Sequence, residues 1–391
     1  MNFIKKHIDT IVIVFLMGFL ISDFVTSIVF KLAPKSFYRY SGALKLVFET
    51  IMVGMIIANF KKPFRTFWFI VVLTISFIIS QFLLNDATYD FKAQISSGNI
   101  YFFNRYLYVL IFILFVKTVA LKEETYHKIF NYFEYFLYIN AIALFIGYAF
   151  HVEIFRSYEY TTRFGVSGFF SKPGEASYMY MIAIIANYYF WKLNNDKKNL
   201  YKLLFFIVCS LFLGQKKILL FLILLSILHL IHYNRFKKVF RILLPMALVV
   251  FIFFNETIIK AIVKKSVFWT QIYEESGLVS TIFSYRDQLL VTAVKHIEEN
   301  WKFLNYIFGG IDFNEYKVEF EFIDLYIFLG LAGIAYYIYV VSSYLNGGNF
   351  LKRNLVIIAF ITSLLSGGLI LNVTVAILLY IVVKYIMLPN K

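Results

Sequence analysis

Residues 9–30 read DTIVIVFLMGFLISDFVTSIVF, an apolar run whose only charged side chains are Asp9 and Asp23. A helix needs about 20 mostly apolar residues to cross the hydrocarbon core of a bilayer. The run is longer than the apolar core of a cleavable signal peptide, and no convincing small-residue cleavage site follows it. We therefore expect residues 9–30 to form a membrane-spanning helix.

Apolar runs of this kind recur along the chain. We predict twelve membrane spans, at roughly 9–30, 42–60, 66–84, 100–121, 129–150, 173–191, 200–214, 217–233, 239–255, 321–345, 354–371 and 373–388. Glycine and polar residues at 214–217 and 366–372 are expected to divide two longer apolar stretches into separate spans. The sequence thus predicts an all-α, polytopic integral membrane protein with about 12 transmembrane helices and a single domain over 1–391.

The composition supports a membrane protein. The chain has 391 residues, of which 61% are hydrophobic and 16% are charged, against about 45–50% and about 25% in soluble domains. These values exclude a soluble globular enzyme and a disordered chain, and the single Cys209 excludes a disulfide scaffold. We attribute the net charge of +15 to loops at an anionic membrane rather than to nucleic-acid binding. No Cys/His spacing typical of a metal site is present.

Lys and Arg residues are unevenly distributed between the two sets of loops. Loops on the side of the N-terminus carry about twice as many of them as the short loops on the other side. Cytoplasmic loops are enriched in these residues. We expect a protein of the cytoplasmic (inner) membrane with both termini in the cytoplasm.

Two loops predicted on the outer side are long, 151–172 and 256–320, and loops of this length tend to be functional or structured. Within the second, Ser284 and Asp287 have the spacing of a capping box. Apolar residues follow at helical spacing. They are Leu289, Leu290, Ala293, Val294, Ile297, Trp301 and Leu304. An amphipathic helix is predicted there, either as structural cover or with Arg286 in its first turn as an anion-binding group.

Several charged residues fall in or near the predicted spans, where charge is costly. Lys45 and Glu49 are spaced i, i+4 and are expected to pair with each other. Asp23 and Glu134 could each be a structural hydrogen-bond partner or face a cavity, and the sequence leaves both possibilities open. Arg105 could reach the membrane surface or meet an anion in an outer cavity.

An acidic cluster, Glu319, Glu321 and Asp324, lies at the start of the predicted span 321–345. It could reflect the preference of carboxylates for helix N-termini, form the cation or proton site of a transporter, or supply a general base. Glu175, in the first turn after Pro173, also occupies a favourable place for a carboxylate.

Two segments resemble the O-antigen polymerase and ligase superfamily. The stretch RFGVSGFFSKPGEAS at 163–177 is similar to that superfamily's R-x-x-G-x-F-x-E-P segment. The stretch EFEFIDL at 319–325, with Gly330 and Gly333 after it, is similar to the E-x-D-x-x-D and Gly-x-x-Gly segment of Wzy-type polysaccharide polymerases, and Gly309-Gly310 matches a further glycine motif. Lys172 departs from the pattern, which has an acid before the proline. The ligases typically carry His-Asn near 321–324, so the acids found there favour a polymerase.

The resemblance implies a metal-independent membrane glycosyltransferase without a cofactor. Its substrates would be undecaprenyl-diphosphate-linked oligosaccharide units at the outer face of the membrane, polymerised into O-antigen, capsular polysaccharide or exopolysaccharide. A flippase and a chain-length regulator would be its protein partners.

Chemistry assigns candidate residues to that activity. A diphosphate leaving group needs fixed cations, and an acceptor hydroxyl needs a base. The expected diphosphate ligands are Arg163, Arg286, Arg156, Lys216 and Lys217, and the expected bases are Glu321 or Asp324, with Glu319 as a further candidate. Glu175 and Arg105 are secondary candidates. The alternatives are a ligase that transfers glycan to a terminal acceptor, and a lipid-linked oligosaccharide flippase or ion-coupled carrier, although no internal repeat typical of carriers is evident.

Overall fold

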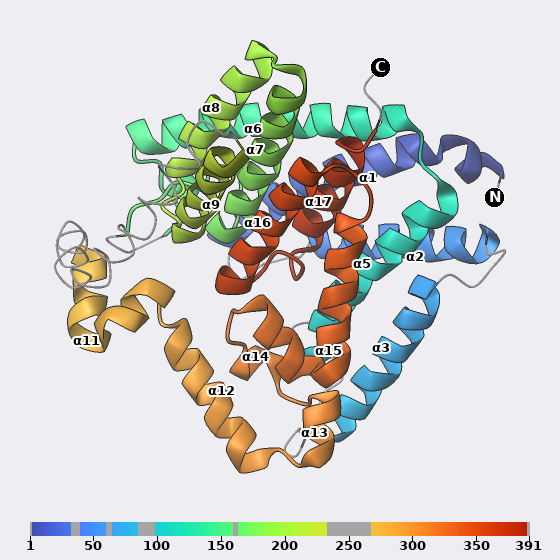
Figure 1. Cartoon of the computed structure of the whole chain (residues 1–391), viewed down its shortest axis with the longest axis vertical. Helices are drawn as coiled ribbons and strands as arrows, with labels where there is room; N and C mark the ends of the chain where they lie inside the picture. The colour runs from blue at the N-terminus through green and yellow to red at the C-terminus, as the bar shows by residue number, and fades with distance from the viewer. Residues whose placement is uncertain are drawn as a thin grey trace.

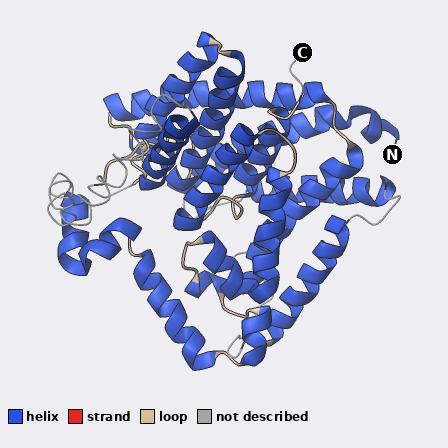
Figure 2. Ribbon diagram, viewed as in Figure 1, coloured by secondary structure: helices blue, strands red, loops and turns tan. Residues whose placement is uncertain are grey.

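The computed structural model describes residues 2–32, 40–59, 65–84, 98–158, 163–232 and 267–388. All regular secondary structure within these ranges is helical (Figure 2). Strand-like pairing among them is limited to an isolated antiparallel bridge between Arg156 and Val166. The predicted all-helical architecture is therefore confirmed for the described part of the chain.

Figure 1 labels the described helices in chain order. Their bounds are α1 Asn2–Leu32, α2 Tyr40–Asn59, α3 Arg65–Phe82, α5 Asn99–Val119, α6 Glu123–Ala149, the 3₁₀ turn η2 Glu153–Phe155, α7 Pro173–Asn194, α8 Lys197–Leu211, α9 Lys216–His232, α11 Val267–Phe283, α12 Arg286–Asn300, α13 Phe303–Phe308, α14 Phe313–Tyr316, α15 Glu321–Leu345, α16 Phe350–Ser366 and α17 Val373–Tyr385.

Six of the described helices are long and apolar enough to cross a membrane: α1, α2, α3, α5, α6 and α15. This supports a helical membrane protein. The predicted number of twelve spans is not confirmed, because α8, α9, α16 and α17 have 15, 17, 17 and 13 residues, fewer than the roughly 20 needed to cross the hydrocarbon core. The predicted span 239–255 lies outside the described residues.

The short helix α17 illustrates why fewer helices than the predicted twelve are long enough to span a membrane. Its residues from Val373 to Val383 are all at most 3% exposed, and it packs against α1, α5, α6 and α7. A helix that is apolar on all sides belongs to a protein core or to a membrane span, and hydropathy alone does not separate the two. The structure places α17 in the core, among the other helices (Figure 1).

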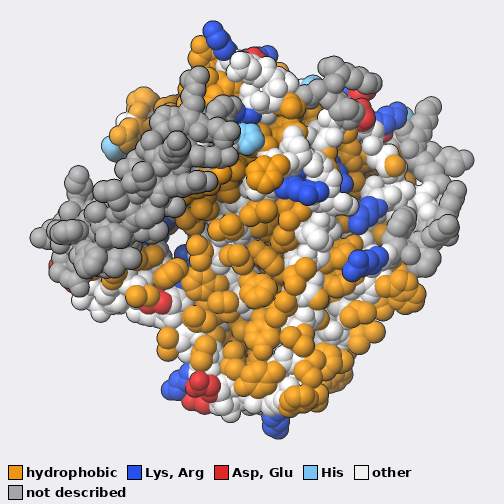
Figure 3. Space-filling model, in the orientation of Figure 1, with side chains coloured by type: hydrophobic (Ala, Val, Ile, Leu, Met, Phe, Trp, Pro, Cys, Tyr) orange, Lys and Arg blue, Asp and Glu red, His pale blue; other side chains and the backbone are white. Residues whose placement is uncertain are grey.

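The outward faces of the longer helices are apolar. On α6, Tyr135, Ile139 and Ile142 are 63%, 54% and 60% exposed, whereas Phe133 and Leu137 on the other side are fully buried. This spacing gives one stripe toward the core and another toward the surroundings. Figure 3 shows a broad hydrophobic area on one face of the molecule. An exposed area of this kind suits contact with lipid.

Buried charges connect neighbouring helices. The expected pairing of Lys45 with Glu49 within α2 is wrong: Lys45 Nζ lies 2.9 Å from Asp23 Oδ1 on α1, and Glu49 accepts a hydrogen bond from Asn104 on α5 at 3.1 Å. Glu134 on α6 forms an ion pair with Lys202 on α8. Pairing across helices satisfies these groups and also fixes the helix packing.

The amphipathic helix predicted after residue 284 is α12. Ala293 is buried against the segment before α15, with Leu290, Ile297 and Trp301 packed around it, so α12 covers the start of α15. The predicted capping box is wrong, because Ser284 and Tyr285 both have positive φ and Asp287 accepts its hydrogen bond from Ser280 instead. A capping box needs an extended N-cap residue.

Glycine allows α13 to end directly against a kink in α15. Gly330 has φ +58°, and a Cβ atom there would lie 2.2 Å from the carbonyl oxygen of Ile307. Gly309 has φ +75° and would meet the carbonyl of Phe328 at 2.6 Å. Two glycines that resemble the family motif thus permit close contact between two backbone segments.

Candidate functional site

A cavity of about 980 Å³ lies where several segments distant in the sequence meet. Its walls come from α5, the loop at 163–172, the start of α7, the turn between α8 and α9, the end of α11, the start of α12, residues 313–319 and the break between α16 and α17. In Figure 1, α12 and α14 lie below α9 and α16. The two helix breaks predicted at 214–217 and 366–372 therefore both contribute to one site.

The lining of the cavity is strongly basic. Its charged side chains are Arg105, Arg163, Lys172, Lys216, Lys217, Arg286, Lys317, Glu175 and Glu319. Seven are cations and two are carboxylates. Cations held at close range repel one another, and a bound polyanion would relieve that repulsion. The arrangement suits a ligand with more than one negative charge.

Several helices, among them α7, α9 and α12, begin at the cavity, which adds to its positive potential. Pro173 occupies the first turn of α7, Lys216 begins α9 and Arg286 begins α12. The unpaired N–H groups of a helix start carry partial positive charge and favour anions. The site thus combines charged side chains with oriented backbone dipoles.

The turn between α8 and α9 holds the 163–166 segment in place. Gly214 has φ +63°, and a Cβ atom there would lie 2.0 Å from the carbonyl oxygen of Phe164. The Val166 N–H donates to the Phe212 carbonyl at 2.8 Å. This close backbone contact, which requires glycine, brings Arg163 to the N-terminus of α9.

Aromatic rings surround two of the predicted diphosphate ligands. The Arg163 guanidinium lies 3.9 Å from the ring centroid of Tyr158 and 5.0 Å from that of Trp269. Lys216 Nζ lies 3.3 Å from the Trp269 centroid. Burial, with Arg163 and Arg286 nearby, lowers the pKa of Lys216 to about 7, and burial also lowers the pKa of Arg163. Rings on the guanidinium and ammonium faces hold both cations in position.

Arg286 and Glu319 form the charged pair of the site. Arg286 donates to the Phe283 carbonyl at 3.2 Å and to Glu319 at 3.1 Å. The Arg286 Nε atom is buried and has no hydrogen-bond partner among the described residues. The Glu319 side chain is 48% exposed, so its carboxylate is open to the cavity while it remains next to a cation.

Glu321 and Asp324 have other partners. The Glu321 carboxylate accepts hydrogen bonds from the Leu369, Ile370 and Leu371 N–H groups at 2.7–3.1 Å, and Asp324 accepts from the N–H groups of residues 318 and 319. Both acids are buried, and neither lines the cavity. They support its walls, whereas Glu319 is the acid of the 319–324 cluster that is accessible from the cavity.

The other predicted site residues divide into two groups. Lys217, Arg105 and Glu175 line the cavity, with Lys217 Nζ 4.2 Å from the Tyr178 ring centroid. Arg156 does not line it and forms an ion pair with Glu153 at 3.1 Å. Arg156 therefore lies outside the group of predicted diphosphate ligands that the structure brings together.

Sequence reasoning missed two cations of the lining, Lys172 and Lys317. Burial, together with nearby Arg105, lowers the pKa of Lys172. Lys172 stood out in the sequence only as a departure from the family pattern, and Lys317 lies two residues before the acidic cluster. A search for cations next to the motifs would have found both. Among the described residues, no group of His, Cys, Asp and Glu side chains has the arrangement of a metal site.

Comparison with protein-family models, with curated proteins and with solved structures found no match to the chain.

Proposed function

We propose that the protein is a membrane polysaccharide polymerase that joins polyprenyl-diphosphate-linked oligosaccharide units. The single observation that carries the proposal is the basic cavity, in which cations from five of the described segments surround one accessible carboxylate, Glu319. The reaction needs the same combination, because it releases a lipid diphosphate and deprotonates a hydroxyl.

The acceptor hydroxyl attacks the anomeric carbon of the donor sugar, and the bond from that carbon to the diphosphate oxygen breaks. Glu319 takes the hydroxyl proton. Arg163, Arg286, Lys216 and Lys217 bind the diphosphate and stabilise the charge that develops on it as it leaves. Catalysis thus rests on a base and a fixed set of cations, each supplied by a side chain of the cavity.

The surroundings of the cavity fit a lipid-linked substrate. Exposed apolar faces of the long helices offer a surface for the polyprenyl chain. Charged side chains within α1, α2 and α6 would also suit a transporter, but they have partners on neighbouring helices, as in Asp23 with Lys45 and Glu134 with Lys202. These pairs are explained by helix packing, and we favour the polymerase.

The genetic test uses Arg163→Ala and Arg286→Ala. Each variant should abolish polymer and leave single lipid-linked units on the outer leaflet, with normal amounts of folded protein. Lys295→Ala is the matched control, because Lys295 lies on α12, is 75% exposed and does not line the cavity. Wild-type chain lengths in both arginine variants would refute the proposal, and accumulation of units on the inner leaflet would identify a flippase. Complete polymer that stays attached to the lipid diphosphate would identify a ligase.

A further inference from the structure

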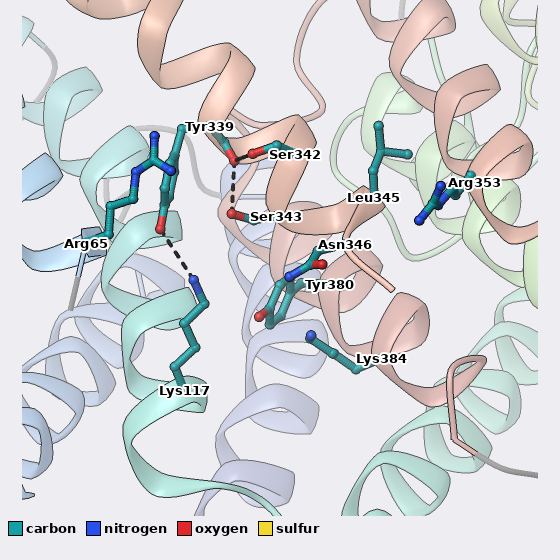
Figure 4. A pocket seen from close by; sticks show the side chains of 10 residues that line it. All are labelled: Arg65, Lys117, Tyr339, Ser342, Ser343, Leu345, Asn346, Arg353, Tyr380 and Lys384. Atoms are coloured by element: carbon teal, nitrogen blue, oxygen red, sulfur yellow. Dashed lines mark hydrogen bonds between the residues drawn. The ribbon is translucent and has the colours of Figure 1, made fainter. Parts of the chain in front are cut away.

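A second pocket, of about 560 Å³, lies away from the cavity and is drawn in Figure 4. Its volume falls within the range of roughly 300–1,000 Å³ that is common for small-ligand sites. Its lining residues are Arg65, Lys117, Tyr339, Ser342, Ser343, Leu345, Asn346, Arg353, Tyr380 and Lys384. We call it the basic pocket.

The basic pocket and the cavity lie toward opposite ends of the same helices. Helix α5 contributes Arg105 to the cavity and Lys117 to the basic pocket, about 18 Å further along the helix axis. Helix α16 runs the other way, from Arg353 in the basic pocket to Ser366 in the cavity. The loop charges predict that the end with the basic pocket is cytoplasmic.

Four cations from four helices surround the basic pocket, and its lining contains no carboxylate from the described part of the chain. Figure 4 shows Arg65 and Lys117 on one side and Arg353 and Lys384 on the other. Among the described residues, none of the four forms an ion pair with an Asp or Glu side chain. The positive charge of the pocket is therefore not balanced by the described part of the protein.

Polar groups between the cations hold the pocket in shape. Lys117 Nζ donates to Thr66 Oγ1 at 3.2 Å and to the Tyr339 hydroxyl at 3.3 Å. The next residue before Arg353, Lys352, is buried and donates to the Gly347 carbonyl at 2.8 Å. Lys352 thereby closes the turn between α15 and α16, so the position of Arg353 is set by a structured turn.

The pocket adjoins apolar surface. Trp68 lies one turn from Arg65 on α3 and is 57% exposed, and Ile338 lies one turn from Ser342 on α15 and is 60% exposed. Figure 3 shows Lys and Arg side chains near one edge of the hydrophobic area. Charged groups next to exposed tryptophan and aliphatic side chains are typical of the membrane–water interface.

We propose that the basic pocket binds the phosphate of an anionic membrane lipid, with the acyl chains on the adjoining apolar surface of α3 and α15. Lys and Arg bind phosphate oxygens through charge-assisted hydrogen bonds, and basic pockets between membrane helices on the cytoplasmic side suit anionic headgroups. A soluble phosphate ester shares the headgroup chemistry, but it would make no use of the apolar surface. The inference does not depend on the proposed reaction.

The test measures lipid binding to the purified full-length protein by native mass spectrometry, with phosphatidylglycerol titrated into detergent micelles. The wild type should retain phosphatidylglycerol and release phosphatidylcholine. The Lys117→Gln/Arg353→Gln double variant should bind phosphatidylglycerol about tenfold more weakly or worse, as expected for the loss of two basic contacts to a headgroup. Lys128→Gln/Lys198→Gln removes the same charge from exposed residues outside the pocket and should bind like the wild type.

Two further arms separate the sources of phosphate and verify folding. Inorganic phosphate and glycerol 1-phosphate should compete poorly with the lipid, and competition at the affinity of phosphatidylglycerol would overturn the lipid assignment. The single variant Arg353→Lys keeps both Lys117 and the positive charge at position 353, so it should retain most of the phosphatidylglycerol binding. Unchanged phosphatidylglycerol binding in the double variant, or equal losses in the control pair, would overturn the proposal.

Discussion

At the scale of single residues, Glu319 is the acid of the 319–324 cluster that lines the cavity, and its backbone is fixed by Asp324. Glu319→Gln should lower the polymerisation rate by about 10²-fold or more, the usual loss when a general base is removed. Binding of the lipid diphosphate should change much less, because the cations remain. Single-turnover rates and equilibrium binding, measured on the same preparation, distinguish the two effects.

The matched control for that variant is Glu315→Gln. Glu315 lies on α14, is exposed and does not line the cavity, so its loss should leave the rate unchanged. Glu321→Gln should act on stability instead, since an amide NH₂ would face backbone donors, at a cost of about 1–3 kcal/mol. A normal rate in Glu319→Gln would remove Glu319 from the mechanism.

Lys216 gives the site a predicted pH dependence. Burial lowers its pKa from 10.5 to about 7, so the ammonium loses its proton as the pH rises through 7. A bound diphosphate favours the charged form and raises the pKa, so binding takes up a proton above pH 7. Burial also lowers the pKa of the neighbouring Lys217 to about 7. Diphosphate affinity should therefore fall above pH 7, by at most about tenfold per pH unit for each of the two lysines.

Isothermal titration with a short-chain polyprenyl diphosphate between pH 6.5 and 9 tests this dependence. Lys216→Met should bind more weakly at pH 6.5 and show a flatter profile, whose remaining slope belongs to Lys217. The same slope in wild type and Lys216→Met would assign the titration to another group.

At the scale of helices, the contact between α13 and the kink of α15 depends on glycine. Gly330→Ala should destabilise the protein by about 1–3 kcal/mol, because its φ of +58° is strained for alanine and a Cβ atom would meet Ile307. Gly54→Ala is the control, since a Cβ atom there meets nothing within 4 Å. Thermal unfolding in detergent should show a lower Tm only for Gly330→Ala, and equal Tm values would contradict the close contact.

The positions of helices and of the breaks between them were predicted better than the helix caps and the number of membrane spans. The breaks at 214–217 and 366–372 follow from glycine and polar residues, and α12 follows from its apolar spacing. The capping box failed because positive φ at Ser284 depends on tertiary contacts. The count of twelve spans is not confirmed, because apolar composition alone does not distinguish a full-length span from a shorter buried helix such as α17, which has 13 residues.

The candidate site was predicted only in part, because some of its contacts join residues far apart in the sequence. Motifs placed Arg163, Arg286 and Lys217 in loops of one predicted membrane side, and the structure brings them to one cavity. Spacing could not show that Glu321 binds backbone N–H groups of residues 369–371, which lie far along the chain. Identifying the accessible carboxylate required the three-dimensional arrangement.

At the scale of the whole molecule, the cavity and the basic pocket mark two ends of the bundle. The positive-inside distribution predicts the cavity end outside. In spheroplasts, Lys295→Cys should react with a membrane-impermeant maleimide and Lys198→Cys should not, because both residues are exposed but lie near different ends. The native Cys209 is buried and gives little background. Labelling in the reverse order would invert the topology and place the cavity in the cytoplasm.

The most direct measurement of the central claim is reconstitution. Purified protein in vesicles would receive lipid-diphosphate-linked repeat units with no other protein, and the products would be separated on a gel. We predict a ladder of multiples of the unit that disappears in Arg286→Ala and in Glu319→Gln and persists in Lys295→Ala. A folded wild-type protein that binds the correct substrate but yields no ladder would contradict the account.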